Sequence, residues 1–262
     1  MKKPYLLNKT LLILFFIFLE IILILFIKNY YDNERKKILE QNSQHVHIQF
    51  DTINNALENL ADTIFKGYID RDTIKESFKN KDRKGLLELL SIDYQYLKTS
   101  GVKQLHFHLP DNSSFLRLHK TEKYGDDLSK IRYSVAYVNK YHKKISGFET
   151  GKVLPGLRNV YPLFIGEEYL GSVEISFGIE FLERNIEDIY NLSTHFLINK
   201  EKFDGVVFKE DRIHYKESLE NKKYVELIRK NEDPLFQYIK FDEATNKLID
   251  TKTKANETFN FE

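Results

Sequence analysis

The chain contains no cysteine, which excludes a disulfide framework, a thiolate metal site and a cysteine nucleophile. It also lacks an excess of either charge, because 40 basic residues are matched by 39 acidic ones and the net charge is +1. Nucleic-acid-binding proteins usually carry a strong basic excess or patch. The balance therefore predicts that nucleic acid is not a partner.

The sequence also lacks the short motifs of the common enzyme classes. We find no G-x-S-x-G, H-E-x-x-H, G-x-x-x-x-G-K-[ST] or G-x-G-x-x-G pattern. We therefore expect neither an enzyme nor a cofactor. Two alternatives stay open: a membrane-anchored hydrolase, and a structural or partner-binding ectodomain without a ligand.

One long apolar run is present near the N-terminus. Leu11 to Ile27 consists of Leu, Ile and Phe, interrupted only by Glu20. A helix of about this length can cross the hydrocarbon core, and Lys2, Lys3 and Lys9 favour a cytoplasmic N-terminus over residues 1–10. The run lacks the small residues of a signal-peptide cleavage site, which favours a retained anchor over residues 11–27. We expect a single-pass protein of the bacterial inner membrane with a periplasmic C-terminal domain. Glu20 is either tolerated or paired in a helix–helix contact.

Helical patterns follow the apolar run. The segment from Tyr31 to Phe65 has no proline or glycine, and its apolar residues form one stripe at Ile53, Leu57, Leu60 and Ile64. Gly67 marks the expected end of this helix. A second helical stretch is expected from Asp72 to Leu97, with a break at Gly85.

Strand patterns begin after this stretch. The segment ending at Leu109 alternates, Pro110–Ser113 is a turn, and Ser114–His119 alternates again, which predicts a hairpin. Three further strands are expected at Ile145–Glu149, Gly156–Ile165 and Tyr169–Phe177, with short helices at Ser134–Tyr141 and Phe181–Leu192. This order predicts an α+β fold with one antiparallel sheet packed on helices.

The C-terminal region is less regular. We expect strands near Phe196–Ile198 and Val206–Phe208, a helix near Lys222–Lys230, and a polar tail from Asn246.

The hairpin is predicted to have two chemically different faces. Pairing across the turn places Leu109 opposite Ser114 and His106 opposite Arg117. Because alternate residues share a face, one face is apolar and packs on the helices, with Leu105, Phe107, Leu116 and Leu118. The other face is polar, with His106, His108, Arg117 and His119.

The polar face suits a small anionic or zwitterionic metabolite. Arginine offers a fork of donors for a carboxylate, while carboxylates such as Asp126 could bind an amine. Aromatic residues could supply the walls. The predicted ligand-binding residues are His106, His108, Arg117, His119, Lys120, Arg132, Phe148, Glu149, Tyr161 and Glu174. The open alternative is a structural salt-bridge network under the loop Lys120–Ile131.

A three-histidine metal site is a further reading of His106, His108 and His119. Arg117 would lie among these ligands and repel a cation. We therefore predict no metal.

Four segments together resemble the double Cache sensor domains of bacterial chemoreceptors, sensor histidine kinases and diguanylate cyclases. They are "LHFHLPDNSSFLRLHKTEKYGDDL" from Leu105, "SGFETG" from Ser146, "NVYPLF" from Asn159 and "YLGSVEISF" from Tyr169. The resemblance implies a long helix and a membrane-distal PAS-like module over residues 31–192. It also implies a smaller membrane-proximal module over residues 193–262, whole or truncated.

Double Cache proteins normally re-enter the membrane and continue into a cytoplasmic signalling domain. No second apolar run follows Ile27, so we expect the output domain to be absent from this chain. The resemblance implies a role in signal transduction or chemotaxis, as part of a dimer. Because the output domain is expected to be absent, the partner is either a second copy or a full-length receptor bound through Tyr31–Phe65.

Overall fold

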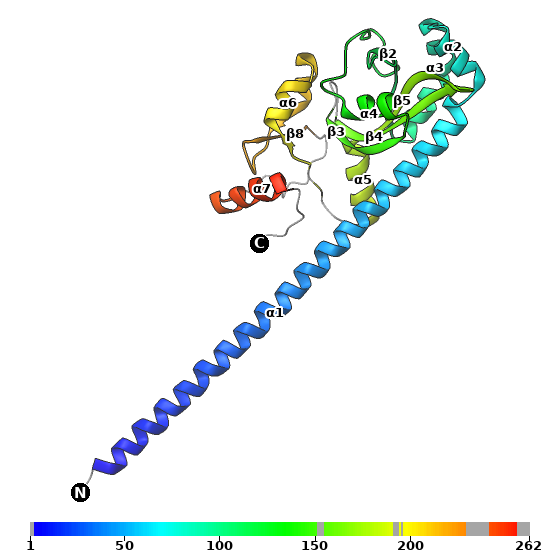
Figure 1. Cartoon of the computed structure of the whole chain (residues 1–262). Coiled ribbons are helices and arrows are strands. Elements are labelled where there is room, and N and C mark those ends of the chain that lie inside the picture. Colours follow the sequence, from blue (N-terminus) through cyan, green and yellow to red (C-terminus); the bar gives the residue numbers. More distant parts are fainter. Residues whose placement is uncertain (1–2, 151–154, 191–193, 195, 229–240, 256–262) are drawn as a thin grey trace. The chain divides into compact units, whose positions relative to one another are not determined.

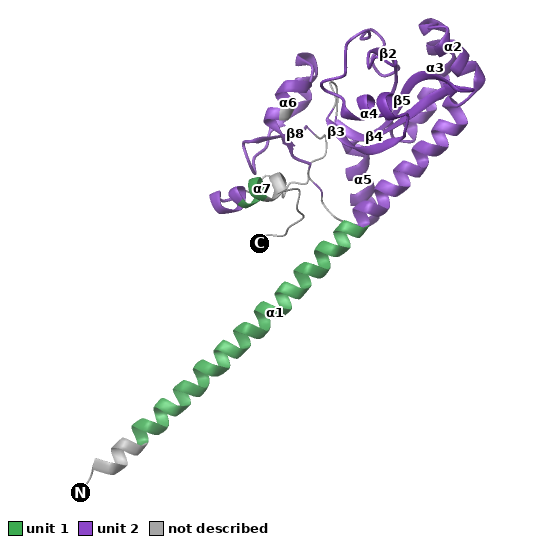
Figure 2. Cartoon of the chain, in the orientation of Figure 1, with its two compact units in different colours: residues 1–48, 248–262 green, residues 49–247 purple. Residues whose placement is uncertain are grey.

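A computed structural model describes residues 3–150, 155–190, 194, 196–228 and 241–255. The chain divides into two compact units, residues 1–48 with 248–262 and residues 49–247 (Figure 2). Helix α1 (Lys3–Ile64) begins in the first unit and continues into the second.

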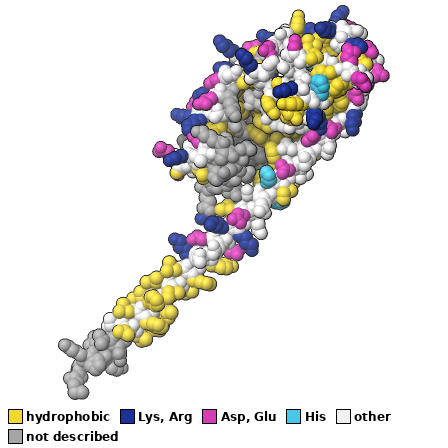
Figure 3. Space-filling model, in the orientation of Figure 1, with side chains coloured by type: hydrophobic (Ala, Val, Ile, Leu, Met, Phe, Trp, Pro, Cys, Tyr) yellow, Lys and Arg dark blue, Asp and Glu magenta, His cyan; other side chains and the backbone are white. Residues whose placement is uncertain are grey.

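The first unit contains the predicted anchor. All residues from Leu11 to Ile27 are helical and exposed, and Figure 3 shows the apolar side chains of this part of α1 followed by charged ones. Among the described residues, this is the one helix that is long and apolar enough to cross a membrane. A signal sequence can also meet these criteria of length and composition. Helix α7 (Glu243–Ala255) replaces the first part of the polar tail predicted from Asn246, so that prediction is wrong there. Residues 256–262 lie outside the described part.

Three helical segments of the second unit form one layer. The last turns of α1 lead into a π-helical turn (Phe65–Ile69), and α2 (Asp72–Lys79) and α3 (Arg83–Thr99) follow. The predicted helix end at Gly67 falls within the π-helical turn. The predicted break at Gly85 occurs earlier, because the Asp82 carboxylate accepts a hydrogen bond from Gly85 N at 2.9 Å and caps α3.

The second layer is an antiparallel sheet of five strands in the order β2-β1-β5-β4-β3 (Figure 1). Helix α4 (Tyr133–Tyr141) connects β2 to β3, and α5 (Ile179–Tyr190) follows β5. The α+β class and the sheet packed on helices are confirmed. The strand bounds are β1 Val102–His108, β2 Ser114–Arg117, β3 Ile145–Thr150, β4 Pro155–Ile165 and β5 Glu168–Gly178.

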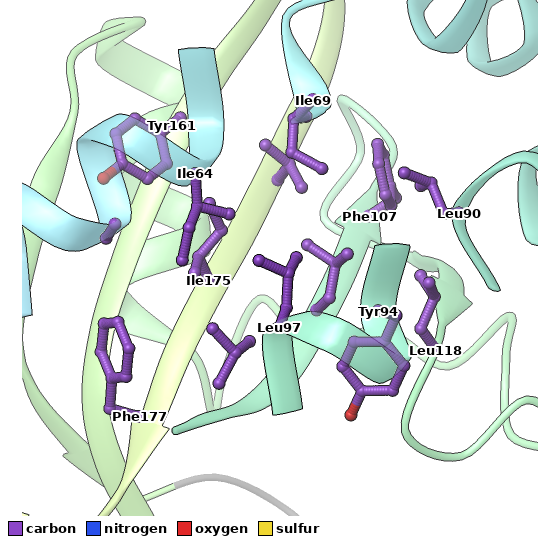
Figure 4. Close-up of a cluster of buried hydrophobic side chains, with 14 of the residues drawn as sticks. Ile64, Ile69, Leu90, Tyr94, Leu97, Phe107, Leu118, Tyr161, Ile175 and Phe177 are labelled. Carbon is purple, nitrogen blue, oxygen red and sulfur yellow. The ribbon is translucent and has the colours of Figure 1, made fainter. Parts of the chain in front are cut away.

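The core lies between the helices and one face of the sheet. Ile64, Leu90 and Leu97 from the helical layer pack with Phe107 and Ile175 from the strands (Figure 4). Burial of such side chains stabilises the fold by about 1.5–3 kcal/mol each. The predicted apolar face of the hairpin therefore packs on the helices as expected.

A smaller sheet follows, in the order β6-β8-β7. Its strands are β6 (Ile198–Asn199), β7 (Tyr215–Glu217) and β8 (Tyr224–Leu227), and α6 (Lys200–Val206) and a 3-10 helix (Lys209–His214) connect β6 to β7.

Two predictions for this region are wrong. The strand expected at Val206–Phe208 is the end of α6 and the segment after it, and the helix expected at Lys222–Lys230 is strand β8 in its described part. Both Tyr224 and Val225 favour an extended backbone, and β8 pairs on both sides with β6 and β7. Tertiary pairing therefore decides the structure of this segment.

Candidate functional site

The hairpin of β1 and β2 carries the residues from which the site is built. His106 lies opposite Arg117 and Phe107 opposite Leu116, as predicted. Beyond this point the register shifts, so that Ser114 lies opposite His108 and not opposite Leu109 as predicted. A bulge of this kind leaves one extra residue unpaired, here Phe115. The Ser114 hydroxyl thereby comes within 2.8 Å of His106 Nε2.

Two neighbouring strands complete the same face of the sheet. Glu174 lies opposite His106 on one side and Val160 on the other, and Arg158 lies opposite Ser176. Paired residues share a face, so the histidines, Glu174 and Arg158 point to the same side. We call this side the polar face; its strand residues are Gln104, His106, His108, Ser114, Arg117, Arg158, Ser172, Glu174 and Ser176, and all of them are buried.

The loop that follows the hairpin contacts the polar face. The cover loop, residues 118–132, is hydrogen-bonded to the hairpin from Ser114 N to Asp126 O at 3.0 Å and from Gly125 N to Ser114 O at 2.7 Å. Arg117 extends the connection with a bidentate ion pair to Asp126. Helix α4 follows the cover loop and contacts β3, β4 and β5.

A network of ion pairs lies at the centre of the polar face. Arg158 Nη1 is 2.6 Å from Glu174 Oε1, and Arg132 donates hydrogen bonds to Glu174 Oε2 and to Glu149 Oε2. Burial by itself raises the pKa of Glu174, but the charges of Arg132 and Arg158 outweigh burial and hold this pKa well below its usual range. Glu174 is therefore an ionised carboxylate shared by two guanidinium groups.

Three histidine rings lie beside this network. Burial lowers the pKa of His106 well below its usual value and lowers the pKa values of His108 and His119 to about 3. All three rings are consequently neutral near pH 7. Among the described residues, His108 Nε2 and His119 Nδ1 have no hydrogen-bond partner, although both atoms are buried. Such buried polar atoms need an explanation, which can be a water, an ion or another bound molecule.

The same residues offer only a poor metal site. Ligand atoms of His106, His108 and Glu174 lie within 4.8 Å of one another. Glu174 is already bound by Arg132 and Arg158, so a divalent cation would enter a space next to two guanidinium groups. The absence of a metal stays a prediction.

Seven of the ten predicted site residues meet at the polar face, and an eighth lies at its edge. The seven are His106, His108, Arg117, His119, Arg132, Glu149 and Glu174. Lys120 belongs to the cover loop and reaches the C-terminal region, where its Nζ is 2.8 Å from Asp211 Oδ2.

The other two predicted residues, Tyr161 and Phe148, lie on the opposite face of the sheet. Tyr161 is opposite Val173, so it points toward the helices, stacks on Phe65 and donates a hydrogen bond to Asp62 at 2.7 Å. Phe148 stacks on Phe196 and is 46% exposed. Strand alternation explains the correction, because Tyr161 follows Val160, which shares the face of Glu174.

Sequence reasoning missed Arg158 and the two uncharged side chains, Gln104 and Ser176, to which it donates hydrogen bonds. Arg158 donates hydrogen bonds to Gln104 and to Ser176 Oγ as well as to Glu174. The available signal was a single charged residue inside the largely apolar strand predicted at Gly156–Ile165. A charge at such a position is buried only when it is paired.

A cavity of about 310 Å³ lies elsewhere, at the turn of the hairpin. None of its lining residues belongs to the predicted set, and Lys79 and Glu168 form an ion pair of 2.8 Å beside it. Its lining residues are Phe78, Lys79, Lys81, Leu109, Pro110, Asp111, Glu168, Tyr169 and Leu170.

Comparison with known protein families identifies the fold. A sequence model described as the double sensory domain of two-component sensor kinases matches residues 39–243. The chain belongs to this double Cache family. Double Cache domains are ligand-binding sensor modules. No curated protein matches the chain.

Solved structures of sensor domains are similar to this chain at low sequence identity and with TM-scores below 0.5. A domain of a putative sensory box/GGDEF family protein from Vibrio parahaemolyticus is 15% identical, with a TM-score of 0.43 over 57% of this chain and 63% of that one. The sensor domain of the V. cholerae histidine kinase DctB is 12% identical, with a TM-score of 0.42 over 56% and 59%. The Campylobacter jejuni chemoreceptor Tlp3, solved with isoleucine bound, is 11% identical, with a TM-score of 0.39 over 62% and 69%. This chain therefore covers less than two thirds of the first two structures.

Proposed function

We propose that the chain is a membrane-anchored extracytoplasmic sensor domain that binds a small anionic or zwitterionic metabolite on the polar face, beneath the cover loop. The observation that carries this proposal is the burial of Arg117, Arg132 and Arg158 together with three neutral histidines on one face of a sensor sheet. The protein would act in the bacterial inner membrane, with the sensor domain in the periplasm.

Burial of so many polar groups is costly for a purely structural core. Moving an ion from water into a protein interior costs several kcal/mol even after relaxation, and apolar residues of similar volume often replace a buried ion pair at no loss of stability. A binding site explains this cost, because convergent donors and acceptors are needed to recognise a polar ligand.

The charges on the polar face favour a zwitterion over a simple anion. Three guanidinium groups are matched by the carboxylates of Asp126, Glu149 and Glu174. A ligand carboxylate would take the place of one of these carboxylates on Arg132, whose planar fork suits it. A ligand ammonium would then pair with the carboxylate that was released. The bare nitrogens of His108 and His119 would accept or donate the remaining hydrogen bonds.

Signalling requires a ligand that binds two conformations unequally. The two conformations would differ in the position of the cover loop. A ligand on the polar face would favour either the closed or the open position of this loop. The output would come from a homodimer, or from a heterodimer with a full-length receptor, because sensor domains of this family typically dimerise.

A screen by thermal unfolding tests the proposal. The full chain in detergent is heated with amino acids, dicarboxylates and simple amines, and we expect a rise in Tm for a subset that contains carboxylates. Arg132→Gln should abolish this rise, whereas Lys79→Gln at the hairpin-turn cavity should retain it. A stabilising ligand whose effect survives Arg132→Gln and disappears in Lys79→Gln would contradict the proposal.

A second function has one observation in its favour. Every guanidinium group of the polar face already has a carboxylate partner, as in a structural network that stabilises a ligand-free ectodomain. The same screen separates the two functions, because no metabolite would raise the Tm of such an ectodomain.

A further inference from the structure

Glu20 lies near the middle of the apolar run in α1. Its side chain is exposed, and the cationic residues nearest to it along the chain are Lys9 and Lys28. At about 1.5 Å per residue these lie roughly 16 Å and 12 Å away along the helix axis, which is beyond the reach of a glutamate side chain. A carboxyl group at this depth in a bilayer has no water to bind, and ionisable residues in such positions usually have a functional partner.

Within the apolar run, from Ile13 to Ile27, the face of α1 that carries Glu20 is apolar on both sides of it. A helix advances by about 100° per residue, so Ile13, Ile24 and Ile27 lie within about 40° of Glu20. Beyond the apolar run, Tyr31 and Ile38 lie within about 20° of Glu20 and continue this face. Glu34, about 40° away, lies at its edge. Tyr31 is 68% exposed and Ile38 is 53% exposed, so the described part of the first unit leaves both uncovered.

We propose that two copies of this chain associate in parallel along this face and that the two Glu20 carboxyl groups hydrogen-bond to each other inside the membrane. The face consists of Ile13, Glu20, Ile24, Ile27, Tyr31 and Ile38. The contact rests on the proposed membrane anchor and is independent of the ligand.

A second copy is the partner that fits the chemistry best. A neutral carboxyl group has one donor and also accepts, so two identical groups satisfy each other. Parallel two-fold symmetry brings both groups to the same depth, whereas neither Lys9 nor Lys28 of a symmetric partner reaches that depth. Hydrogen bonds between polar side chains are an established source of helix association in membranes.

Tyr31 and Ile38 support the same partner from outside the membrane. A pair of large apolar side chains exposed on one helix face is stabilised when a second helix covers it. In a parallel dimer through Glu20, each of these residues would meet its own counterpart. The contact would thus extend from the membrane toward the sensor domain.

The absence of cysteine allows a direct test by disulfide formation. Single substitutions Tyr31→Cys and Ile38→Cys are placed on the proposed face, and Asn29→Cys and Lys36→Cys on the opposite side of α1. After mild oxidation of the full chain in lipid vesicles, we expect covalent dimers to form several-fold faster in the first pair. Equal rates in both pairs, or no dimers in the first pair, would overturn the proposal.

Substitution of Glu20 tests the role of the carboxyl group. In vesicles with fluorescently labelled full chain, Glu20→Leu should weaken association by about tenfold, since one interhelical hydrogen-bonding site is lost. Glu20→Gln keeps a donor and an acceptor and should stay within about threefold of the wild type. Phe18→Leu, on the opposite side of the helix, is the matched control.

The experiments distinguish failure of the Glu20 contact from failure of the proposed membrane anchor and of the proposed ligand site. Unchanged association in Glu20→Leu, or an equal loss in Glu20→Gln, would contradict a shared hydrogen bond between the two carboxyl groups. Release of the wild-type chain from vesicles by alkaline extraction would instead contradict the proposed membrane anchor itself. Neither result would alter metabolite-induced changes in Tm, which test the proposed ligand site separately.

Discussion

Arg117 holds Asp126 in a bidentate ion pair, with Nη1 2.8 Å from Oδ1 and Nη2 3.0 Å from Oδ2. The same Nη1 donates a hydrogen bond to Lys123 O at 2.7 Å. Strand β2 is thereby connected to the cover loop through one buried guanidinium group. Bidentate pairs of this kind are among the stronger polar contacts in proteins.

Loss of this contact should loosen the cover loop. We expect Arg117→Met to lower the free energy of unfolding by about 1–3 kcal/mol, because Asp126 and the Lys123 carbonyl lose their partner. Hydrogen exchange of residues 119–131 should rise more than that of β4. Arg71→Met is the control, because Arg71 is exposed and its pair with Asp93 should contribute less than about 1 kcal/mol. Equal losses in the two variants would show that Arg117 does not hold the loop.

Glu174 should be the most sensitive residue of the polar face. Glu174→Gln removes the charge shared by Arg132 and Arg158 at nearly constant volume, and leaves two buried cations with less compensation. Breaking a buried ion pair by removing one partner typically costs about 3–5 kcal/mol. Chemical denaturation measures this loss, and Glu168→Gln, in the exposed pair with Lys79, provides the baseline. A Glu174→Gln variant as stable as Glu168→Gln would mean that the network contributes little to stability.

Acid should destabilise the sensor domain well before its carboxylates titrate. The pKa values of His108 and His119 fall from 6.5 to about 3 on folding, chiefly because of burial. Below pH 6.5 the unfolded chain therefore binds more protons than the folded chain, and stability decreases by up to about 1.4 kcal/mol per pH unit for each histidine. Glu174, whose pKa is also lowered on folding, adds a further loss only below about pH 4.5.

Urea denaturation between pH 7 and pH 5 measures this slope. His108→Gln and His119→Gln should each flatten it, whereas His47→Gln, outside the polar face, should not. A slope that is the same in all three variants would contradict the burial of neutral histidines.

Tyr161 should affect stability without affecting ligand binding. Tyr161→Phe removes the hydrogen bond to Asp62 on the helix side of the sheet, at a cost of about 1 kcal/mol. Any metabolite that raises the Tm of the wild type should raise the Tm of this variant by the same amount. If the metabolite no longer raises the Tm of Tyr161→Phe, Tyr161 is part of the ligand site.

The sequence predicted the hairpin because its signals were local. Alternation and the Pro110 turn fixed the pairing of His106 with Arg117, and with it the separation of an apolar and a polar face. The bulge at Phe115 could not be predicted, because nothing in the alternation distinguishes an extra residue. Its effect is specific: Ser114, expected opposite Leu109, faces His108 and binds His106.

The misplacement of Tyr161 has a different cause. The face of a residue in β4 depends on its register with β5, which pairs Val160 with Glu174, and no local pattern reports that register. Arg158 was missed for the same reason, since its partner Glu174 is known only once the strands are paired. Likewise, β8 is a strand because it pairs with β6 and β7, and these pairings cannot be read from the local sequence.

Histidine ring resonances of the full chain give the most direct test of a ligand site on the polar face. The protein is labelled in its imidazole rings and titrated with whichever amino acid or dicarboxylate raises its Tm. Binding on the polar face should shift the resonances of His106, His108 and His119 in proportion to saturation, with those of His45 and His47 unchanged. A ligand that stabilises the protein while all three rings stay unperturbed would contradict the account.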